Sequence, residues 1–379
     1  MGYPFTEEQE IIQQTAREFT KEYIEPMAAE IDRTALHPKE ILQSLAEQGF
    51  MGTFLPGDFG GAEAGFLSYT LIIEEISKSS GAIASILNHH AALVAYSINS
   101  WGSQEQKEQY LPAMCEGELL GSFAFSEPDA APGVGEHRVT ACKDGDSYIL
   151  NGRKCYVANG GAADVYLIFA LTDPEAGIKG MSAFIVNGNT PGLTVARAIK
   201  KMGLRGCQSA ELIFDNMKIS QNCLLGTEGA GVAIVAKAQA AAGVAEGAMV
   251  VGIAQAAMDD AVEYGKQRIQ FKQPIVRFPA IQTMLAEMAT NIHMLRLAVY
   301  HAAELIEKDE PFAAEAAMIK LFAARIGQSA LIDVVQIEGG YGYSEDMVAS
   351  RFFRDIKGVI IKNCSIDFPE TVIANSLLD

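Results

Sequence analysis

The sequence predicts an α+β fold in which a middle antiparallel β domain lies between an N-terminal helical domain and a C-terminal helical bundle. The first observation is the helical spacing of apolar residues near the start, as in TEEQEIIQQTAREFTKEYI. The second is a set of short alternating runs broken by Asp-Gly and Asn-Gly, as in VTACKDGDSYILNGRKCYVANGG, which is typical of hairpins. The third is the long alanine-rich region of helical period that follows.

These elements divide the chain into three predicted domains. The first spans residues 1–118, where Thr6 is a plausible helix cap and LPGDFGGAEAG at 55–65 is a glycine-rich loop. The second spans 119–228 and adds strands at DVYLIFAL, MSAFIVNG and ELIFDNMKIS. The third, 229–379, is expected to form a four-helix bundle from helices near 229–267, 279–307, 311–338 and 345–358.

Composition excludes several classes of function. The 379 residues carry a formal net charge of −18 and no long basic run, so we expect no nucleic-acid partner. Six cysteines are scattered without the spacing of metal ligands, which argues against a metal site and favours reduced thiols in the cytoplasm. The start lacks the pattern of a signal peptide, and the longest uncharged span, 79–104, holds several Ser, Asn and His, so we expect no membrane span.

Five separated stretches resemble the acyl-CoA dehydrogenases, in that family's order, from about residue 5 to about residue 358. They are FAFSEP at 123–128, NGRKCYVANGGAADVYLIFA at 151–170, KKMGLRGCQSAELIFD at 200–215, GIAQAAMDDAVEYGKQRIQF at 252–271 and GGYGYSEDMVASRFFRD at 339–355. The resemblance implies an enzyme that binds FAD and acts on the α and β carbons of an acyl-CoA thioester. In such enzymes a carboxylate removes the α-proton and the flavin receives the β-hydrogen as hydride.

The resemblance also implies which residues hold FAD. Phe125, Ser126, Tyr156 and Ala158 match positions beside the flavin ring, although the family often has a hydroxyl where Ala158 stands. Arg268 matches an arginine that meets the pyrophosphate of a neighbouring subunit's FAD. The other expected cofactor contacts are Phe271, Gln336, Gly339, Gly340 and Ser365.

Each of these positions has a structural alternative, such as an aromatic that fills a sheet face, a charge at a helix end or glycines that stop a helix. Sharing of FAD between subunits implies a dimer or, as the favoured state, a homotetramer, with a hetero-oligomer as a further alternative. Electron-transfer flavoprotein is then an expected electron partner.

The usual catalytic glutamate of the family is missing. The matching position is Asn363, which cannot accept a proton at neutral pH, and the alternative position on the first helix of the bundle is Ala242. Glu246 follows one helical turn later, in GVAEGAMVVGIAQ, and is the predicted base or substrate contact. Its structural alternative is a pairing with a neighbouring Lys or Arg, or a place on a subunit seam. Asp367 is another candidate acid.

The predicted substrate contacts are His89, His90 and Asn363. Both histidines lie in ILNHHAAL, which the resemblance places on the helix that floors the substrate pocket. A hydrogen-bonded structural histidine is the alternative for each. Three functions stay open: an FAD oxidoreductase with a non-standard base or chemistry, a base-less subunit of a hetero-oligomeric acyl-CoA dehydrogenase, and a redox-silent acyl-CoA-binding protein.

Overall fold

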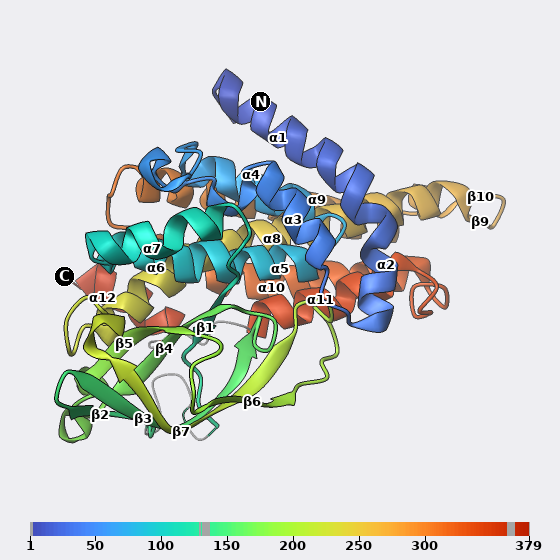
Figure 1. Ribbon diagram of the computed structural model, residues 1–379. Helices are drawn as coiled ribbons and strands as arrows, with labels where there is room; N and C mark the ends of the chain where they lie inside the picture. The colour runs from blue at the N-terminus through green and yellow to red at the C-terminus, as the bar shows by residue number, and fades with distance from the viewer. Residues whose placement is uncertain (1–2, 129, 131–136, 362–367, 379) are drawn as a thin grey trace.

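The computed structural model describes residues 3–128, 130, 137–361 and 368–378. Helices form both ends of the chain, and the middle of the chain forms a sheet that packs against one side of them (Figure 1). The predicted α+β fold is therefore confirmed. The exact domain boundaries stay predictions, and both of them fall in connections between elements.

The N-terminal region is helical. Its α-helices are α1 (Glu7–Phe19), α2 (Glu25–Thr34), α3 (Lys39–Glu47), α4 (Gly65–Ser77), α5 (Gly81–Asn88), α6 (Tyr96–Trp101) and α7 (Gln104–Cys115). Two π-helical segments, η1 (Thr20–Ile24) and η4 (His89–Ala95), join α1 to α2 and α5 to α6. The predicted Thr6 cap is confirmed, because its Oγ1 accepts the Gln9 backbone N–H at 3.2 Å and the Gln9 side chain accepts the Thr6 N–H at 3.0 Å.

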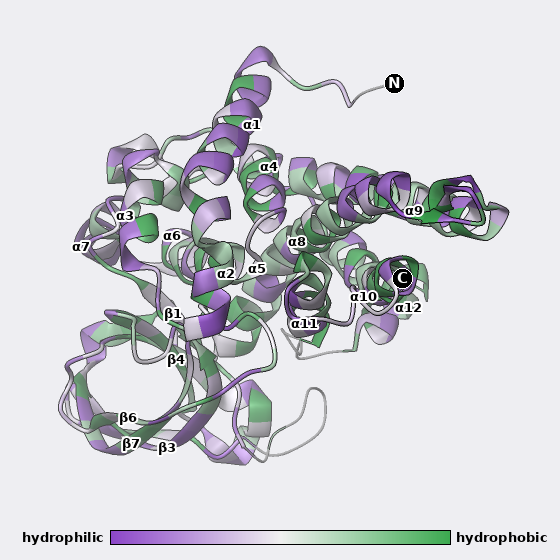
Figure 2. Ribbon diagram, turned by 90° about the vertical axis from the view of Figure 1, so that its right-hand side faces the viewer, coloured by the Kyte–Doolittle hydropathy of each residue, from purple (hydrophilic) through white to green (hydrophobic). Residues whose placement is uncertain are grey.

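The middle region is an eight-stranded sheet that curls around a core of its own (Figure 2). Its strands are β1 (Gly121–Ala124), β2 (Thr140–Asp144), β3 (Ser147–Ala158), β4 (Val165–Leu171), β5 (Met181–Asn187), β6 (Leu193–Ala198), β7 (Ser209–Ser220) and β8 (Leu224–Leu225). The order is β6-β7-β3-β2-β4-β5-β8, with β1 also paired to β4. The interior is apolar, with Tyr148, Phe184 and Phe214 at 2% exposure or less.

The sheet is mixed, where the sequence predicted an antiparallel one. β1 and β2 both pair with β4 in parallel, with Gly121 opposite Val165, Ala124 opposite Ile168 and Thr140 opposite Leu171. The two strands thus lie one after the other along the same edge of β4 and run in the same direction. Turn motifs in a sequence indicate only antiparallel pairs of consecutive strands. They therefore gave no sign that β1 and β2 both pair with β4 in parallel.

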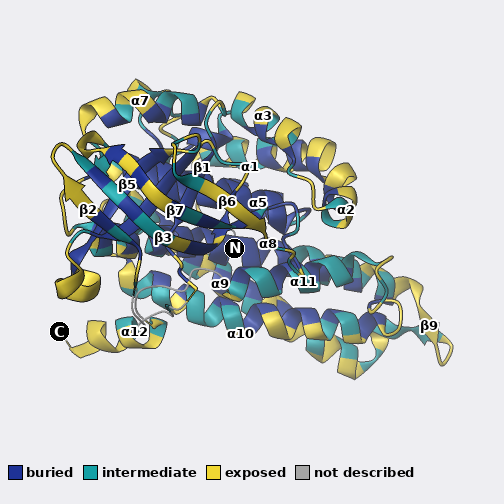
Figure 3. Cartoon of the chain, turned by 60° about the horizontal axis from the view of Figure 1, so that its bottom comes forward, coloured by how far each residue is buried: buried dark blue, intermediate teal, exposed yellow. Residues whose placement is uncertain are grey.

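The C-terminal region contains the four predicted long helices, α8 (Gly231–Gln267), α9 (Pro279–Glu307), α10 (Ala313–Glu338) and α11 (Val348–Ile361), and a further helix, α12 (Pro369–Leu378). A hairpin of β9 (Ile269–Gln270) and β10 (Gln273–Pro274) connects α8 to α9. The hairpin projects from the end of the bundle and is largely exposed (Figures 1 and 3).

Helix α8 runs through the centre of the molecule. It contacts α4, α5, α9, α10 and α11 as well as the sheet, and most of its residues are buried (Figure 3). By length and composition alone it could cross a membrane, but 83% of its most apolar window is buried inside the protein. That burial is the pattern of a core helix.

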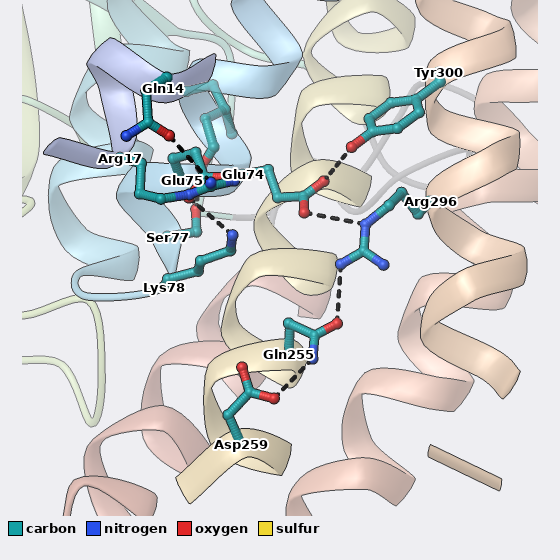
Figure 4. A network of polar contacts seen from close by, with 11 residues as sticks. Gln14, Arg17, Glu74, Glu75, Ser77, Lys78, Gln255, Asp259, Arg296 and Tyr300 are labelled. Carbon is teal, nitrogen blue, oxygen red and sulfur yellow. Dashed lines mark hydrogen bonds and ion pairs between the residues drawn. The ribbon is translucent and has the colours of Figure 1, made fainter. Parts of the chain in front are cut away.

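A buried polar network ties the N-terminal helices to the bundle (Figure 4). The Glu74 carboxylate on α4 accepts hydrogen bonds from Arg296 Nε at 3.0 Å and from the Tyr300 hydroxyl at 2.9 Å, both on α9. Arg296 also donates to Gln255 on α8 at 3.1 Å. Because Glu74 is 2% exposed, these charge-assisted bonds replace the water it loses and fix the packing of three helices.

Candidate active site

A cavity of about 470 Å³, here called the main cavity, lies where the sheet meets the helices. Its walls come from α5 and η4, the ends of β1 and β3, the connection before β7, α8 and α11. Enclosed spaces of this size, with apolar walls and a few polar groups, are typical ligand sites. Five predicted site residues line it: His89, Phe125, Ser126, Tyr156 and Ala158.

Tyr156 lies at a β-bulge. The pairing of β3 with β7 shifts register between Lys154 and Val157, and Tyr156 has φ 51°, in the left-handed region that residues with a side chain rarely adopt. Its side chain is 68% exposed and lines the main cavity. Two residues later the Ala158 carbonyl accepts the Ser122 hydroxyl at 2.7 Å, which holds the strand end against β1. Unusual backbone conformation beside an exposed aromatic is typical of a ligand-binding position.

A buried ion pair supports the wall that carries Phe125 and Ser126. Lys154 is fully buried, and its Nζ donates to the Phe125 carbonyl and to Glu127 Oε1, both at 2.8 Å. Glu127 Oε2 accepts the backbone N–H of Arg138 at 2.6 Å, and His137 Nδ1 lies 3.2 Å from Oε1. The pair therefore joins the two ends of the chain segment between β1 and β2.

The Glu127 carboxyl group is ionised at neutral pH. Burial alone would raise the pKa of Glu127, but the hydrogen bond from His137 and the charge of Lys154 outweigh it and hold the pKa at about 2. Burial lowers the pKa of Lys154, while the carboxylate of Glu127 opposes that change. The charge of each partner thus favours the ionised form of the other.

The two histidines have different environments. His89 lines the main cavity, and its Nδ1 donates to the Ser85 carbonyl at 2.7 Å. His90 is fully buried, and its Nδ1 accepts the Gly121 N–H of β1 at 3.1 Å. Burial lowers the pKa of His90 to about 4, so this ring is neutral and holds β1 against η4. This environment agrees with the alternative given for His90, a histidine that is hydrogen-bonded inside the protein and has a structural role.

Four basic side chains, here called the basic rim, line the main cavity. None of them was among the site residues predicted from the sequence. They are Lys200, Lys201, Arg354 and Lys357. Arg354 donates to both oxygens of Asp32, at 2.9 and 2.5 Å, and to the Met202 carbonyl at 2.9 Å. No Asp or Glu occurs among the described residues that line this cavity. Asp32 balances the charge of Arg354, so the three lysines supply the positive charge of this rim, which favours anionic ligands in a protein of net charge −18.

The segment before β7 packs closely on α11. A Cβ on Gly203 would lie 2.1 Å from the Arg354 carbonyl oxygen, so this close approach requires glycine. Leu204, at φ 51°, donates its N–H to Asp355 Oδ1 at 2.6 Å. Burial raises the pKa of Asp355 to about 6, although the Leu204 N–H opposes that rise. The motif KKMGLRG, which carried part of the family resemblance, therefore also shapes the cavity.

A second group of predicted cofactor residues lies around another cavity, of about 580 Å³, at the end of the bundle beside the hairpin. Arg268, Gly339 and Gly340 line it. Phe271 is 88% exposed at the hairpin turn, and Gln336 is exposed on α10. The two cavities have no described lining residue in common. The structure thus separates the predicted cofactor residues into two groups within one chain.

Glu338 and Asp260 form an unusual carboxyl pair at this second cavity. Glu338 is 2% exposed, and neither of its oxygens, nor Asp260 Oδ2, meets an N–H or O–H donor among the described residues. Burial raises the pKa of Glu338 to about 7, with help from the charge of Asp260 and a hydrogen bond to it. Such a bond between two carboxyl groups needs a shared proton.

We expect Glu338→Gln to stabilise the protein at pH 8 by about 1–3 kcal/mol and to change little at pH 5. The folded-state pKa is raised above the unfolded value, so the stability that the protonated pair contributes is present in acid and is lost as pH rises through about 7. Glutamine keeps a hydrogen-bond donor toward Asp260 at every pH. Thermal unfolding at both pH values tests this, with the exposed Glu345→Gln as control. Equal effects at the two pH values would contradict the shared proton.

Glu246 lies apart from the main cavity. It is 6% exposed and lines a small space between α8, α10 and α11, together with Lys320 and Val359. Gln239, seven residues earlier on the same face of α8, does line the main cavity. Residues of α11 contribute to both spaces, so this helix lies between them. The assignment of Glu246 as the base stays a prediction.

Asn363, Ser365 and Asp367 lie outside the described residues. Within the part that is described, no group of three or more His, Cys, Asp and Glu could hold a metal ion.

A cavity with aromatic walls and a basic rim, between a curled sheet and a helical bundle, is the kind of site in which an enzyme holds a cofactor and its substrate. Models of the N-terminal, middle and C-terminal domains of acyl-CoA dehydrogenase match residues 6–118, 122–217 and 229–366. The chain belongs to the acyl-CoA dehydrogenase family.

Full-length relatives agree with this family. The chain is 40% identical over 373 residues to an acyl-CoA dehydrogenase of Bacillus subtilis, covering 98% of each chain. It is 40% identical over 380 residues to acryloyl-CoA reductase (NADH) of Anaerotignum propionicum, covering 100% of this chain and 96% of the relative. The solved structure of butyryl-CoA dehydrogenase from Megasphaera elsdenii covers all of both chains at a TM-score of 0.95 and 35% identity.

The chain is an acyl-CoA dehydrogenase-like flavoenzyme, and FAD is its cofactor. The structure fits this cofactor, because Tyr156 offers an exposed ring on one wall of the main cavity and Phe125 lines another. Arg268 and the exposed Gly339 and Gly340 provide phosphate-binding chemistry and open backbone at the second cavity.

Proposed function

We propose that this enzyme acts on the α and β carbons of an acyl-CoA thioester without the family's usual glutamate. The main cavity carries this proposal, since its aromatic and apolar wall lies next to a rim of four basic side chains. An acyl-CoA ester needs both, because its chain is apolar and its nucleotide end carries several phosphate charges.

The described residues would divide the work as follows. Tyr156 and Phe125 hold the flavin ring, and bound FAD supplies the redox step. The basic rim attracts and orients the charged end of the thioester. The buried lining residues, including Leu93, Phe123 and Leu204, exclude water around the acyl carbons.

Glu246 remains our candidate for the proton transfer. Two observations support it: it is a buried carboxylate on α8, and it lies on the same helix face as Gln239 of the main cavity. Its oxygens would have to reach the α-proton within hydrogen-bond distance or through one water.

A second candidate function is a base-less member of the family, either a subunit that works with a base-bearing sister chain or a redox-silent acyl-CoA-binding protein. The placement of Glu246 in the smaller space between α8, α10 and α11 favours this alternative. So does the lack of a carboxylate among the described lining residues of the main cavity.

The assembly and its surroundings are also proposals. We infer a homotetramer in which Arg268 and Phe271 on the projecting hairpin meet the cofactor of a neighbouring subunit. Electron-transfer flavoprotein is the proposed electron partner, and the cytoplasm is the proposed compartment.

We expect the purified chain to bind FAD and to lose its visible flavin absorbance when a suitable acyl-CoA ester is added without oxygen. A panel of saturated and α,β-unsaturated CoA esters, added to the oxidised and to the reduced protein, tests both directions of reaction. Flavin that binds but never responds to any ester, in a protein that still binds CoA esters, would favour the redox-silent alternative. Activity that returns only with a copurifying sister chain would favour the subunit alternative.

A further inference from the structure

Glu338 is a buried acid that the proposed mechanism does not use. It is the last residue of α10 and is 2% exposed, and protein atoms cover both of its carboxyl oxygens without supplying an N–H or O–H donor from the described part of the chain. The helix dipole also disfavours a negative charge at the C-terminal end of a helix. A leucine or glutamine would avoid both costs. An acid in this place is therefore suited to a role that depends on its ionisation.

Asp260 on α8 is the charged group that faces Glu338. A hydrogen bond joins the two carboxyl groups, and it requires a proton between them. The other charged or titratable residues that line the adjacent second cavity are Tyr264, Arg268, Tyr341 and Asp346. Burial and Asp260 raise the pKa of Glu338 to about 7, and no cation within the described residues offsets that rise. The pair therefore gains or loses its shared proton near neutral pH.

The turn that follows α10 packs directly on the side chain of Glu338. A Cβ on Gly342 would lie 2.8 Å from Glu338 Cβ and 3.0 Å from its Oε2, so only glycine allows this close approach. The same turn carries Gly339, Gly340 and Tyr341, all of which line the second cavity. Ionised carboxyl oxygens need water or hydrogen-bond donors around them. Ionisation of Glu338 would therefore shift this turn and, with it, one wall of the second cavity.

The charge of the pair matters as well. Arg268 and Glu338 both belong to the wall of the second cavity, and Arg268 supplies the positive charge that a phosphate group needs. Loss of the shared proton would add one negative charge inside the protein, where salt and water screen it poorly. That charge would oppose Arg268 and repel a phosphate-bearing ligand. Charge and turn position thus act in the same direction.

We propose that the proton shared by Glu338 and Asp260 controls how tightly the second cavity holds the phosphate-bearing part of FAD, so that retention of the cofactor depends on pH. The proposal rests on the proposed function, in which Arg268 meets the cofactor of a neighbouring subunit. The two carboxyl groups are positioning residues, since they set the turn and the charge behind Arg268 without touching FAD. Tight binding is present in acid, where the pair holds its proton, and is lost as pH rises through about 7.

Release of FAD from the holoenzyme tests this proposal. The FAD-loaded protein is equilibrated at several values between pH 6 and pH 9, at a temperature at which circular dichroism shows that it stays folded. The fluorescence of the released flavin gives the dissociation constant. We expect this constant to rise with pH above about 7, by about tenfold per pH unit at most, which is the limit for a single linked proton. Equal dissociation constants at pH 6 and pH 9 would overturn the proposal without any variant.

Two variants identify the group responsible. Glu338→Gln cannot ionise and should hold FAD with the same affinity at every pH, close to that of the wild type at pH 6. Asp260→Asn removes a charge that raises the pKa of Glu338, so the loss of affinity should move to lower pH. The exposed Glu345→Gln should keep the wild-type profile. A wild-type profile in Glu338→Gln, or an equal loss of affinity at every pH, would show that the proposal is wrong.

Arg268→Met distinguishes failure of this proposal from failure of the proposed function. We expect it to weaken FAD binding at pH 6, where the pair holds its proton and Arg268 meets the phosphates unopposed. Unchanged affinity in Arg268→Met would remove the second cavity as a cofactor site, and the proposal with it. That result is distinct from a flat pH profile in a protein that needs Arg268 to hold FAD.

Discussion

Lys154→Met is expected to lower the free energy of unfolding by about 3–5 kcal/mol, because it leaves the buried Glu127 carboxylate without its cation. The lost hydrogen bond to the Phe125 carbonyl should also loosen one wall of the main cavity. We therefore expect weaker FAD retention in the variant, measured by flavin release during thermal unfolding. Lys218→Met is a suitable control, since its ion pair with Asp144 is exposed on the sheet surface.

The double variant Lys154→Met/Glu127→Leu separates charge from packing. The double variant leaves no lone buried charge and should recover part of the lost stability, while the N–H groups of Arg138 and Val139 still lose their acceptor. The pH dependence gives a further test. Because the folded pKa of Glu127 is depressed to about 2, the stability that its carboxylate contributes is present above about pH 4.3 and is lost as pH falls toward 2. Variants without the pair should lack that part of the acid transition.

Glu246→Gln is expected to lower turnover by about 10²–10⁴-fold if Glu246 carries the proton, which is the usual contribution of a general base. Glutamine has nearly the same shape and cannot accept the proton. Flavin content and acyl-CoA affinity should change much less than turnover. Rapid-mixing measurements of flavin reduction by the best ester of the panel would give the rate of the chemical step directly.

The control for this variant is Glu263→Gln, since Glu263 lies on the same helix and forms an exposed pair with Lys266. Unchanged turnover in Glu246→Gln would end the assignment of Glu246 as base. A large loss of unfolding free energy with little loss of turnover would instead show that Glu246 has a structural role among α8, α10 and α11.

Much of the fold could be predicted because local patterns determine it. The predicted helices at 229–267 and 279–307 differ from α8 and α9 by two residues at most, since long apolar and alanine-rich periods leave few alternatives. The parallel pairing of β1 and β2 with β4 could not be predicted, because it depends on contacts between distant parts of the chain. The π-helical turn at His89 carries no comparable sequence signal.

Family motifs supplied candidate residues for the site, but the sequence did not show how those residues are arranged in space. Family motifs predict flavin contacts for Phe125 and Tyr156 and a substrate contact for His89, and all three residues line the main cavity. Helical period predicts that Glu246 shares a face of α8 with Ala242. Gln239 lies on nearly the same face, but seven residues span about 10 Å along a helix. Helix α11 packs on α8 between the positions of Gln239 and Glu246, so the two side chains line different spaces. The packing of α11 on α8 is a tertiary contact that the local sequence pattern does not reveal.

The succession of β1 and β2 along one edge of β4 has a consequence for how this scaffold can be altered. Neither ladder depends on how much chain is inserted between the two strands, so new sequence added there would not disturb any existing strand pair. The chain segment that connects β1 to β2 also contains Phe125 and Ser126, which line the main cavity. Engineered insertions or grafted loops at this point could therefore redirect ligand choice while the supporting sheet is left intact.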